Sequence, residues 1–259
     1  MNPDFGATAG DYARFRQGFP DSLYERLSAC GVGLPGQAVV DLGTGTGTLA
    51  RGFALRGCRV TGIDPDARLL EQARRLDQEA GVRVDHRVAR AEDTGLPGAC
   101  ADVVSAGQCW HWFERERAAR ESARLLVDGG ALAIAHFDWI PLPGNVVEAT
   151  ERLIEQHNPD WKLGGGAGIY SRWVRDLDAA GYRAIECFAY DQDAPYTPEA
   201  WRGRVRASAG IGASLPPDRV AAFDADLAAL LETRFPGDVI AVAHRVFAAM
   251  GRKTGQTPG

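Results

Sequence analysis

The sequence predicts an α/β protein with a doubly wound, mostly parallel sheet and a mostly helical cap inserted late in the chain. Three observations support this prediction. Over residues 1–138, short apolar runs alternate with longer amphipathic stretches, as strands and helices do in such folds. A glycine-rich turn follows the first apolar run. The 259 residues are also enough to bury one large core without disulfides or metals.

Five apolar runs in this first part have the length and composition of buried strands. They cover residues 38–42, 59–63, 82–88, 101–106 and 131–137. Amphipathic periodicity predicts helices over 46–56, 66–80 and 113–126, and Pro65 and Gly81 stand at typical helix boundaries. A helix over 11–29, interrupted by Pro20, comes first. The Asp-Gly-Gly sequence at 128–130 predicts a turn before the fifth strand.

The second half of the chain is less regular. Helices are predicted over 146–157, 171–180, 198–208 and 217–234, and strands over 183–190 and 239–247. Four glycines in residues 162–169 predict a mobile loop. We interpret the long insertion before the last strand as a cap over the carboxyl edge of the sheet, where α/β folds bind ligands.

Composition and charge argue against several classes of protein. The formal net charge of −5 gives no electrostatic attraction to nucleic acid or to anionic lipid, so neither is expected as a partner. The five cysteines include no CxxC pair, so neither a zinc site nor another metal centre is expected, and free thiols fit a cytoplasmic protein. The N-terminus does not resemble a signal peptide, and no apolar run approaches the roughly 18 residues of a membrane span.

The glycine-rich turn is the strongest functional feature of the sequence. It covers residues 43–47, Gly-Thr-Gly-Thr-Gly, and Asp41 precedes it near the end of the predicted strand. Glycines let a backbone turn sharply and approach a ligand closely. A dinucleotide-binding loop would carry its third glycine where this chain has Thr48, and a phosphate-binding P-loop would need a lysine that is absent here.

A second acidic residue, Asp64, ends the next predicted strand about 20 residues after the turn. A carboxylate at this place can accept hydrogen bonds from the two hydroxyl groups of a ribose. Both NAD and S-adenosyl-L-methionine contain a ribose, so Asp64 does not by itself distinguish the two cofactors. For the whole combination of strand, acid, glycines, helix and distal acid, an ordinary structural turn is the less favoured interpretation.

Several segments, in order along residues 11–138, resemble the class I S-adenosylmethionine-dependent methyltransferases, in particular the small-molecule group called type 11. The similar segments are residues 12–20, 39–47, 60–64, 89–97 and 125–130. In the last of them Asp128 stands where proline is common in the family. Beyond residue 138 only the general layout is similar.

The resemblance implies S-adenosyl-L-methionine as cofactor and assigns roles to single residues. Residues of the glycine turn and the strand before it would bind the cofactor, with its methionine and ribose parts along Asp41, Gly43 and Gly45 and with Thr44 and Gly47 in the same turn. Asp64 would hold the ribose hydroxyls, Ala91 and Glu92 would flank the adenine, and Gln108 would border the cofactor. Tyr12 and Arg16 would fold over the site, although Arg16 is equally well explained as a solvated residue.

The resemblance also suggests how the chain is divided. Residues 1–37 would form an N-terminal helical segment that covers the cofactor site, and residues 38–138 would form the cofactor-binding α/β core. Residues 139–259 would complete the sheet and supply the helical substrate cap, with the whole chain forming a single domain.

Three residues are candidates for the chemistry. His111 lies in an aromatic-rich segment after the fourth strand and could act as a general base, although it could equally cap the next helix. His136 and Asp138 end the fifth strand on one face and could bind substrate or remove a proton. His86 and His244, on other strands, are expected to be structural.

We therefore expect an enzyme that transfers a methyl group to a small molecule and releases S-adenosylhomocysteine, working as a monomer or homodimer. An NAD-type oxidoreductase is one alternative, which the glycine spacing disfavours. A non-catalytic S-adenosylmethionine-binding protein is another. A nucleic-acid or protein methyltransferase is disfavoured by the net charge and, for nucleic acid, by the absence of an Asn/Asp-Pro-Pro-Tyr/Phe sequence.

Overall fold

The computed structural model describes residues 18–255 of the chain. The predicted helix over 11–29 is confirmed in its second half, where α2 spans Asp21–Ala29 after Pro20. Tyr12 and Arg16, two of the residues expected at the cofactor site, lie outside the described residues.

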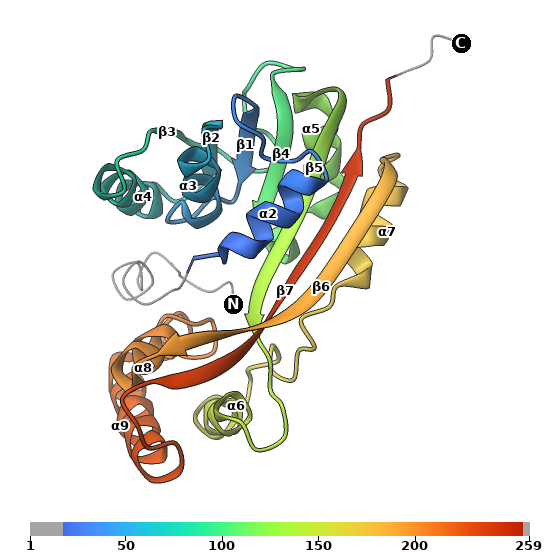
Figure 1. The fold of residues 1–259 in the computed structure, drawn as a ribbon. Helices are drawn as coiled ribbons and strands as arrows, with labels where there is room; N and C mark the ends of the chain where they lie inside the picture. Colours follow the sequence, from blue (N-terminus) through green and yellow to red (C-terminus); the bar gives the residue numbers. More distant parts are fainter. Residues whose placement is uncertain (1–17, 256–259) are drawn as a thin grey trace. The chain divides into compact units, whose positions relative to one another are not determined.

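In this part of the chain, seven strands form one sheet in the order β3-β2-β1-β4-β5-β7-β6 (Figure 1). The strands are β1 (Ala38–Leu42), β2 (Arg59–Asp64), β3 (Val84–Val88), β4 (Ala101–Gly107), β5 (Leu126–Trp139), β6 (Arg183–Tyr196) and β7 (Ile240–Arg252). Strand β1 pairs in parallel with β2 and β4, β2 with β3, and β4 with β5. The strand order reverses at β1 and β4, and ligands of doubly wound sheets bind beside the carboxyl ends of strands at such a reversal. The predicted doubly wound, mostly parallel sheet is confirmed.

The helices between the parallel strands follow the predicted order with slightly shorter bounds. They are α3 (Thr48–Leu55), α4 (Ala67–Glu79) and α5 (Arg115–Leu125), and a 3₁₀ turn, η2 (Trp110–Trp112), precedes α5. Helix α4 starts one residue late because Asp66 caps it: its side chain accepts a hydrogen bond from the amide of Arg68. Apolar side chains of η2 and α5 and of β1, β2, β4 and β5 belong to one buried core, in which Leu42, Ile63 and Trp110 are fully enclosed.

The predicted turn at 128–130 is wrong, because this segment belongs to β5. The register between β4 and β5 slips there, and Gly129 adopts a positive φ of 79° that suits glycine. Its backbone still finds strand partners: the Gly129 amide donates to the Lys253 carbonyl, and the Lys253 amide donates to the Gly130 carbonyl. A bulge in a long strand therefore replaces the expected turn.

The last two strands extend beyond their predicted ends. Strand β6 runs on to Tyr196 and β7 to Arg252, although the apolar patterns suggested ends at 190 and 247. The Ile140 amide donates to the Ala243 carbonyl, whereas Gly129 and Gly130 bond to Lys253, so β7 runs antiparallel to β5. The extension of β6 is polar, so side-chain alternation gives little signal there, whereas β7 continues through the buried apolar residues 248–250.

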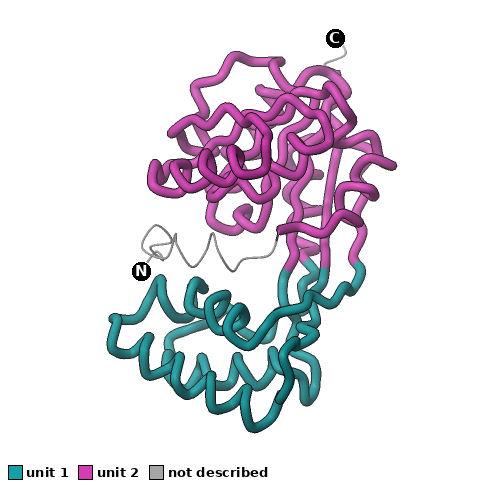
Figure 2. The backbone as a smooth tube through the Cα atoms, turned by 60° about the vertical axis from the view of Figure 1, so that its left-hand side comes forward, with its two compact units in different colours: residues 1–17, 138–169, 190–245 teal, residues 18–137, 170–189, 246–259 magenta. Residues whose placement is uncertain are grey.

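The chain separates into two compact units, shown in different colours in Figure 2. Of the described residues, unit 2 comprises 18–137, 170–189 and 246–255, and so holds the parallel strands and α7 (Ser171–Ala179). Unit 1 comprises residues 138–169 and 190–245. Strands β5, β6 and β7 each pass from one unit into the other along the chain.

Unit 1 is built around three helices with bounds close to those predicted. They are α6 (Val146–His157), α8 (Pro198–Arg206) and α9 (Pro217–Arg234), and α9 packs against both of the others. Trp201 and Phe223 are fully buried in this unit. The glycine-rich segment 162–169 has no helix or strand, as predicted, and its mobility stays a prediction. Among the described residues, no helix is both long and apolar enough to cross a membrane.

Candidate functional site

The glycine turn leaves the carboxyl end of β1 with three left-handed residues. Gly43, Gly45 and Gly47 have φ values of 61°, 56° and 79°. The turn is closed by its own backbone, since the Thr44 amide donates to the Ile63 carbonyl at 2.9 Å and the Gly47 amide donates to the Thr44 carbonyl at 2.8 Å. Each of these glycines occupies a conformation that other residues adopt only with strain.

The surroundings of the first two glycines differ. A Cβ atom on Gly43 would lie 2.8 Å from the ring of Phe113 and 2.9 Å from the sulfur of Cys109, so packing alone excludes a side chain there. A Cβ atom on Gly45 would meet no atom of residues 18–255 within 4 Å. The backbone is therefore tightly packed at Gly43 and open at Gly45, where another molecule can approach it.

Asp64, at the end of β2, is bonded directly to this turn. One carboxylate oxygen accepts from the Gly45 amide at 2.9 Å, and the other accepts from the Asp66 amide at 2.9 Å. The residue is 7% exposed, and burial raises the pKa of Asp64 despite these two bonds. One hydrogen bond thus joins Asp64 to the glycine turn, although about 20 residues separate them in the sequence.

Asp41 lies one strand position before the turn and faces β4. It pairs in register with Ser105, whose hydroxyl donates to its carboxylate at 2.6 Å. Asp41 is only 1% exposed, and burial raises its pKa to about 6. The turn is therefore preceded by a buried acid that holds a proton more tightly than an ordinary aspartate.

The other residues expected around the cofactor lie after β3 and β4. Ala91 is buried, and Glu92 is engaged with the chain itself: its carboxylate accepts from the Glu114 amide at 2.9 Å and lies 3.4 Å from Nε of Arg90. Gln108 follows β4 with a φ of 59°, and its side-chain amide donates to the Phe137 carbonyl. Gln108 thereby ties the end of β4 to the end of β5.

The aromatic segment after β4 forms the turn η2, in which neighbouring side chains differ sharply in exposure. Trp110 is fully buried, and its indole donates to Asp176 of α7 at 3.0 Å. His111 and Trp112 are exposed, with ring centroids 4.5 Å apart. The ring of His111 also lies 5.9 Å from the ring of His136. The structure thus brings together two of the histidines that the sequence singled out.

His136 has a different environment from His111. It is 1% exposed, Tyr170 stacks on its ring at 4.1 Å, and the indole of Trp173 donates to its Nε2 at 3.2 Å. Because Nε2 accepts this bond, a neutral His136 ring carries its proton on Nδ1. Sequence reasoning noticed Tyr170 and Trp173 as aromatic residues but did not connect them with His136, because no local motif links α7 to a strand more than 30 residues earlier.

Asp138 belongs to unit 1, where it lies near a partly buried arginine. The guanidinium of Arg204 stacks over the ring of Trp139 at 4.7 Å. Burial lowers the pKa of Arg204, and the nearby Tyr196 and Asp138 act in the opposite direction. Asp138 is thus placed beside a cation.

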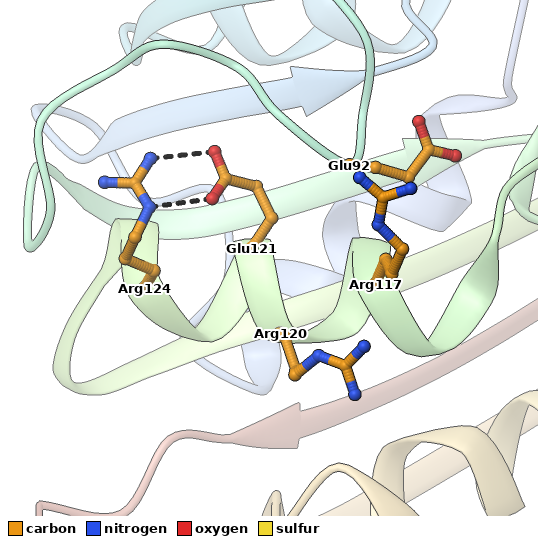
Figure 3. Close-up of a pocket in the computed structure, with 5 residues that line it drawn as sticks. All are labelled: Glu92, Arg117, Arg120, Glu121 and Arg124. Atoms are coloured by element: carbon orange, nitrogen blue, oxygen red, sulfur yellow. Dashed lines mark hydrogen bonds and ion pairs between the residues drawn. The ribbon is translucent and has the colours of Figure 1, made fainter.

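A shallow cavity of about 240 Å³ lies beside α5 and Glu92, and its lining includes no residue of the glycine turn (Figure 3). It is lined by Glu92, Arg117, Arg120, Glu121 and Arg124. Burial alone would raise the pKa of Glu121, but bonds from Arg124 and Thr94 outweigh it and lower this pKa to about 2. Arg117 and Arg120 are paired with glutamates of the same helix. These cations are satisfied within the chain, so the cavity does not present an obvious anion site.

Comparisons with known proteins agree with this arrangement. A family model described as a methyltransferase domain matches residues 40–134, which contain the glycine turn and Asp64. An uncharacterized methyltransferase of Mycobacterium tuberculosis is 34% identical over 156 residues, covering 57% of this chain and 60% of the relative. A ubiquinone biosynthesis O-methyltransferase of Xanthomonas campestris is 28% identical over 182 residues, covering 70% of this chain and 74% of the relative.

A solved structure of a candidate type II methyltransferase from Anaeromyxobacter dehalogenans has a similar fold. It superimposes with a TM-score of 0.66 at 25% identity, covering 93% of this chain and all of the other. The chain spans about three-fifths of the length of the first curated relatives it matches.

Proposed function

We propose that the chain is a class I S-adenosylmethionine-dependent methyltransferase and that it transfers a methyl group from S-adenosyl-L-methionine to a small-molecule acceptor. The products are the methylated acceptor and S-adenosylhomocysteine. One observation carries the proposal: the Asp64 carboxylate is bonded to the Gly45 amide, beside a stretch of turn whose outer side is open. A carboxylate that can accept hydrogen bonds from ribose hydroxyls therefore lies beside a backbone stretch that a ligand can approach, at the place where the strand order reverses.

Different residues around the turn are proposed to bind different parts of the cofactor. Asp64 retains lone pairs for the ribose hydroxyls after accepting its two amide bonds. The backbone N–H groups at the start of α3 suit the amino-acid carboxylate of the cofactor. Asp41 and Gly43 support this part of the turn, and Thr44 and Gly47 close it with their own backbone bond.

The remaining proposed contacts lie after β3 and β4. Ala91 and Glu92 flank the adenine, with Glu92 already held by the start of α5. Gln108 borders the cofactor from a backbone position fixed by its bond to Phe137. Tyr12 and Arg16 are proposed to complete the site from the N-terminal segment.

Methyl transfer from a sulfonium is an in-line displacement in which the cofactor is already activated. The protein's part is to align the two reactants and to keep water away. A base is required only when the attacking atom carries a proton. His111 is our first choice for that base because its ring is exposed. His136 would first have to release its bond from Trp173, and Asp138 interacts with the guanidinium of Arg204.

Two features support a small-molecule acceptor. The net charge of −5 opposes binding to nucleic-acid phosphates. The similar protein of Xanthomonas campestris is named for O-methylation in ubiquinone biosynthesis, which is a small-molecule reaction. An NAD-type oxidoreductase is not favoured, because the third glycine falls at Gly47 instead of at residue 48.

Calorimetric titration of the purified protein with S-adenosylhomocysteine, with NADH titrated in parallel, tests the proposal. We expect a Kd on the order of micromolar for S-adenosylhomocysteine, equivalent to about 8 kcal/mol of binding free energy, and no heat from NADH. Binding of NADH alone, or of neither compound, would show that the turn has been misinterpreted.

A further inference from the structure

A buried chain of three polar side chains runs from β3 to the glycine turn. His86 of β3 bonds through Nε2 to a carboxylate oxygen of Asp77 of α4 at 2.6 Å. The other Asp77 oxygen forms an ion pair with Nε of Arg51 of α3 at 3.0 Å, without the alignment of a hydrogen bond. Arg51 in turn donates from Nη2 to the carbonyl of Thr46 in the turn at 2.6 Å. Side chains from β3, α4 and α3 are thus linked in sequence, and the last of them, Arg51, contacts one peptide group of the turn.

The chain is almost completely enclosed. The side chains of His86, Asp77 and Arg51 are 0%, 5% and 16% exposed. Gly62 of β2 makes room for the imidazole, because a Cβ atom there would lie 2.7 Å from His86 Nδ1. Within the described residues this Nδ1 has no hydrogen-bond partner. Buried ion pairs of this kind contribute little to stability over well-packed apolar residues, so stability alone does not account for the arrangement.

This chain of side chains contacts the turn at one peptide unit. The Arg51 bond holds the carbonyl of the Thr46–Gly47 peptide, and the Gly47 amide of the same unit donates to the Thr44 carbonyl at 2.8 Å. The orientation of this peptide is therefore set at both ends. Because Gly47 caps α3, the same peptide determines how the first N–H groups of the helix are directed.

We propose that Arg51 is a positioning residue for the amino-acid part of the cofactor, and that Asp77 and His86 orient Arg51. The inference rests on the proposed function, in which the start of α3 receives the cofactor's carboxylate. Arg51 acts through the turn and does not touch the cofactor itself. Correct direction of these N–H groups is what a rigid carboxylate site requires, since a displacement of a fraction of an ångström weakens each bond.

The test compares two ligands that differ only in the amino-acid part. S-adenosylhomocysteine carries it, and 5′-methylthioadenosine lacks it. In the variant Arg51→Met, we expect the Kd for S-adenosylhomocysteine to rise at least about tenfold and the Kd for methylthioadenosine to change less than about threefold, as loss of one charge-assisted contact would give. Calorimetry, or competition with a fluorescent cofactor analogue, measures both constants.

Arg56→Met is the matched control. Arg56 follows the same helix, donates to the Gly52 carbonyl at 3.0 Å, pairs with Asp21 and stacks over the ring of Tyr24. None of these contacts among the described residues is made with residues 43–47. Its replacement should leave both constants unchanged. Arg51→Lys should recover part of the preference for S-adenosylhomocysteine, and Asp77→Asn, which keeps the side-chain shape, should lose part of it.

Two results would overturn the inference. One is an unchanged affinity for S-adenosylhomocysteine in Arg51→Met, and the other is an equal loss for both ligands, which would indicate general loosening of the turn. A wild-type protein that binds neither ligand would instead refute the proposed function, and the inference with it.

Discussion

The two compact units use their buried polar side chains differently. In unit 2, two of those around the glycine turn bind backbone groups: Asp64 accepts from two amides, and Arg51 donates to a carbonyl. Asp41, Asp77 and His86 in the same unit bind other side chains. In unit 1, several bind other side chains. Trp139 donates to Glu151 at 2.9 Å, and Trp201 donates to Thr150 at 3.1 Å.

Bonds to backbone and bonds to side chains have different structural consequences. Side chains that bind backbone fix the path of a loop, and a fixed loop can present N–H groups and an open edge to a ligand. Side chains that bind one another fix the packing of helices and indoles, and they shape side-chain surfaces instead. On this view, replacing Asp64 or Arg51 should change cofactor affinity more than stability, and replacing the side chains that link one another in unit 1 should do the reverse.

Replacing one buried carboxylate in each unit gives the largest expected contrast. Asp64→Ala should weaken binding of S-adenosylhomocysteine by at least about a hundredfold, because two charge-assisted bonds to ribose are lost. Glu151→Gln should leave that affinity unchanged. It should instead lower the free energy of unfolding by about 1–2 kcal/mol, because the bonds from Trp139 and from the Gly165 amide lose their charged acceptor.

Calorimetry and urea unfolding measured on both variants check this contrast. Circular dichroism of Asp64→Ala serves as the control that its fold is intact. If Glu151→Gln reduced cofactor affinity as strongly as Asp64→Ala does, the division of roles between the units would be wrong.

The two units also carry buried titratable groups with opposite effects on stability. Burial raises the pKa of Asp41 in unit 2 to about 6, so the folded state holds its proton more tightly than the unfolded state does. Stability from this group falls as the pH rises from about 4 to 6. Burial lowers the pKa of His244 in unit 1 to about 4, so the folded state holds that proton less tightly. Stability from His244 falls as the pH drops from 6.5 to about 4.

Asp41→Asn and His244→Asn separate these effects. Relative to wild type, Asp41→Asn should gain about 2–3 kcal/mol of unfolding free energy as the pH rises from about 4 to about 7. His244→Asn should gain a similar amount relative to wild type as the pH falls from about 7 to about 4. Urea denaturation across this range measures both. Parallel pH profiles for the two variants would contradict the assigned environments.

Much of unit 2 could be predicted because its signals are local. The first strand, 38–42, is predicted with its observed bounds, and the turn and Asp64 are recognised by spacing and indeed meet in the structure. In unit 1, two helices with sustained periodicity, 146–157 and 217–234, are also predicted with their observed bounds. The roles of the site residues and the division of the chain at residues 37 and 138 stay predictions.

What the sequence could not supply depends on contacts between distant elements. The bond from Trp173 to His136 joins a helix to a strand, and the link from Arg51 to Asp77 to His86 joins three elements with no fixed spacing. His86 was expected to be structural, and only its neighbours in space connect it to the turn. The bulge at Gly129 depends likewise on Lys253, more than 120 residues later.

The smallest expected effect concerns ion pairs between helices in unit 1 and within a helix in unit 2. Asp224 of α9 accepts from Arg206 of α8 at 2.6 Å and from Arg202, and its side chain is 18% exposed. Burial would raise the pKa of Asp224, but the two arginines outweigh it and keep this pKa below its usual range. Glu116 of α5 pairs with Arg120 on the surface, where its side chain is 86% exposed.

Asp224→Asn should lower the free energy of unfolding by about 1–2 kcal/mol, because two partly buried cations lose a shared acceptor. Glu116→Gln should change it by at most about 0.5 kcal/mol, because water screens an exposed pair and the helix keeps its backbone bonds. Urea unfolding at low and high salt distinguishes the two. Equal losses would mean that unit 1 does not depend on side-chain links between its helices. A larger loss in Asp224→Asn that persists at high salt would show that these links, unlike the surface pairs of α5, hold α8 against α9.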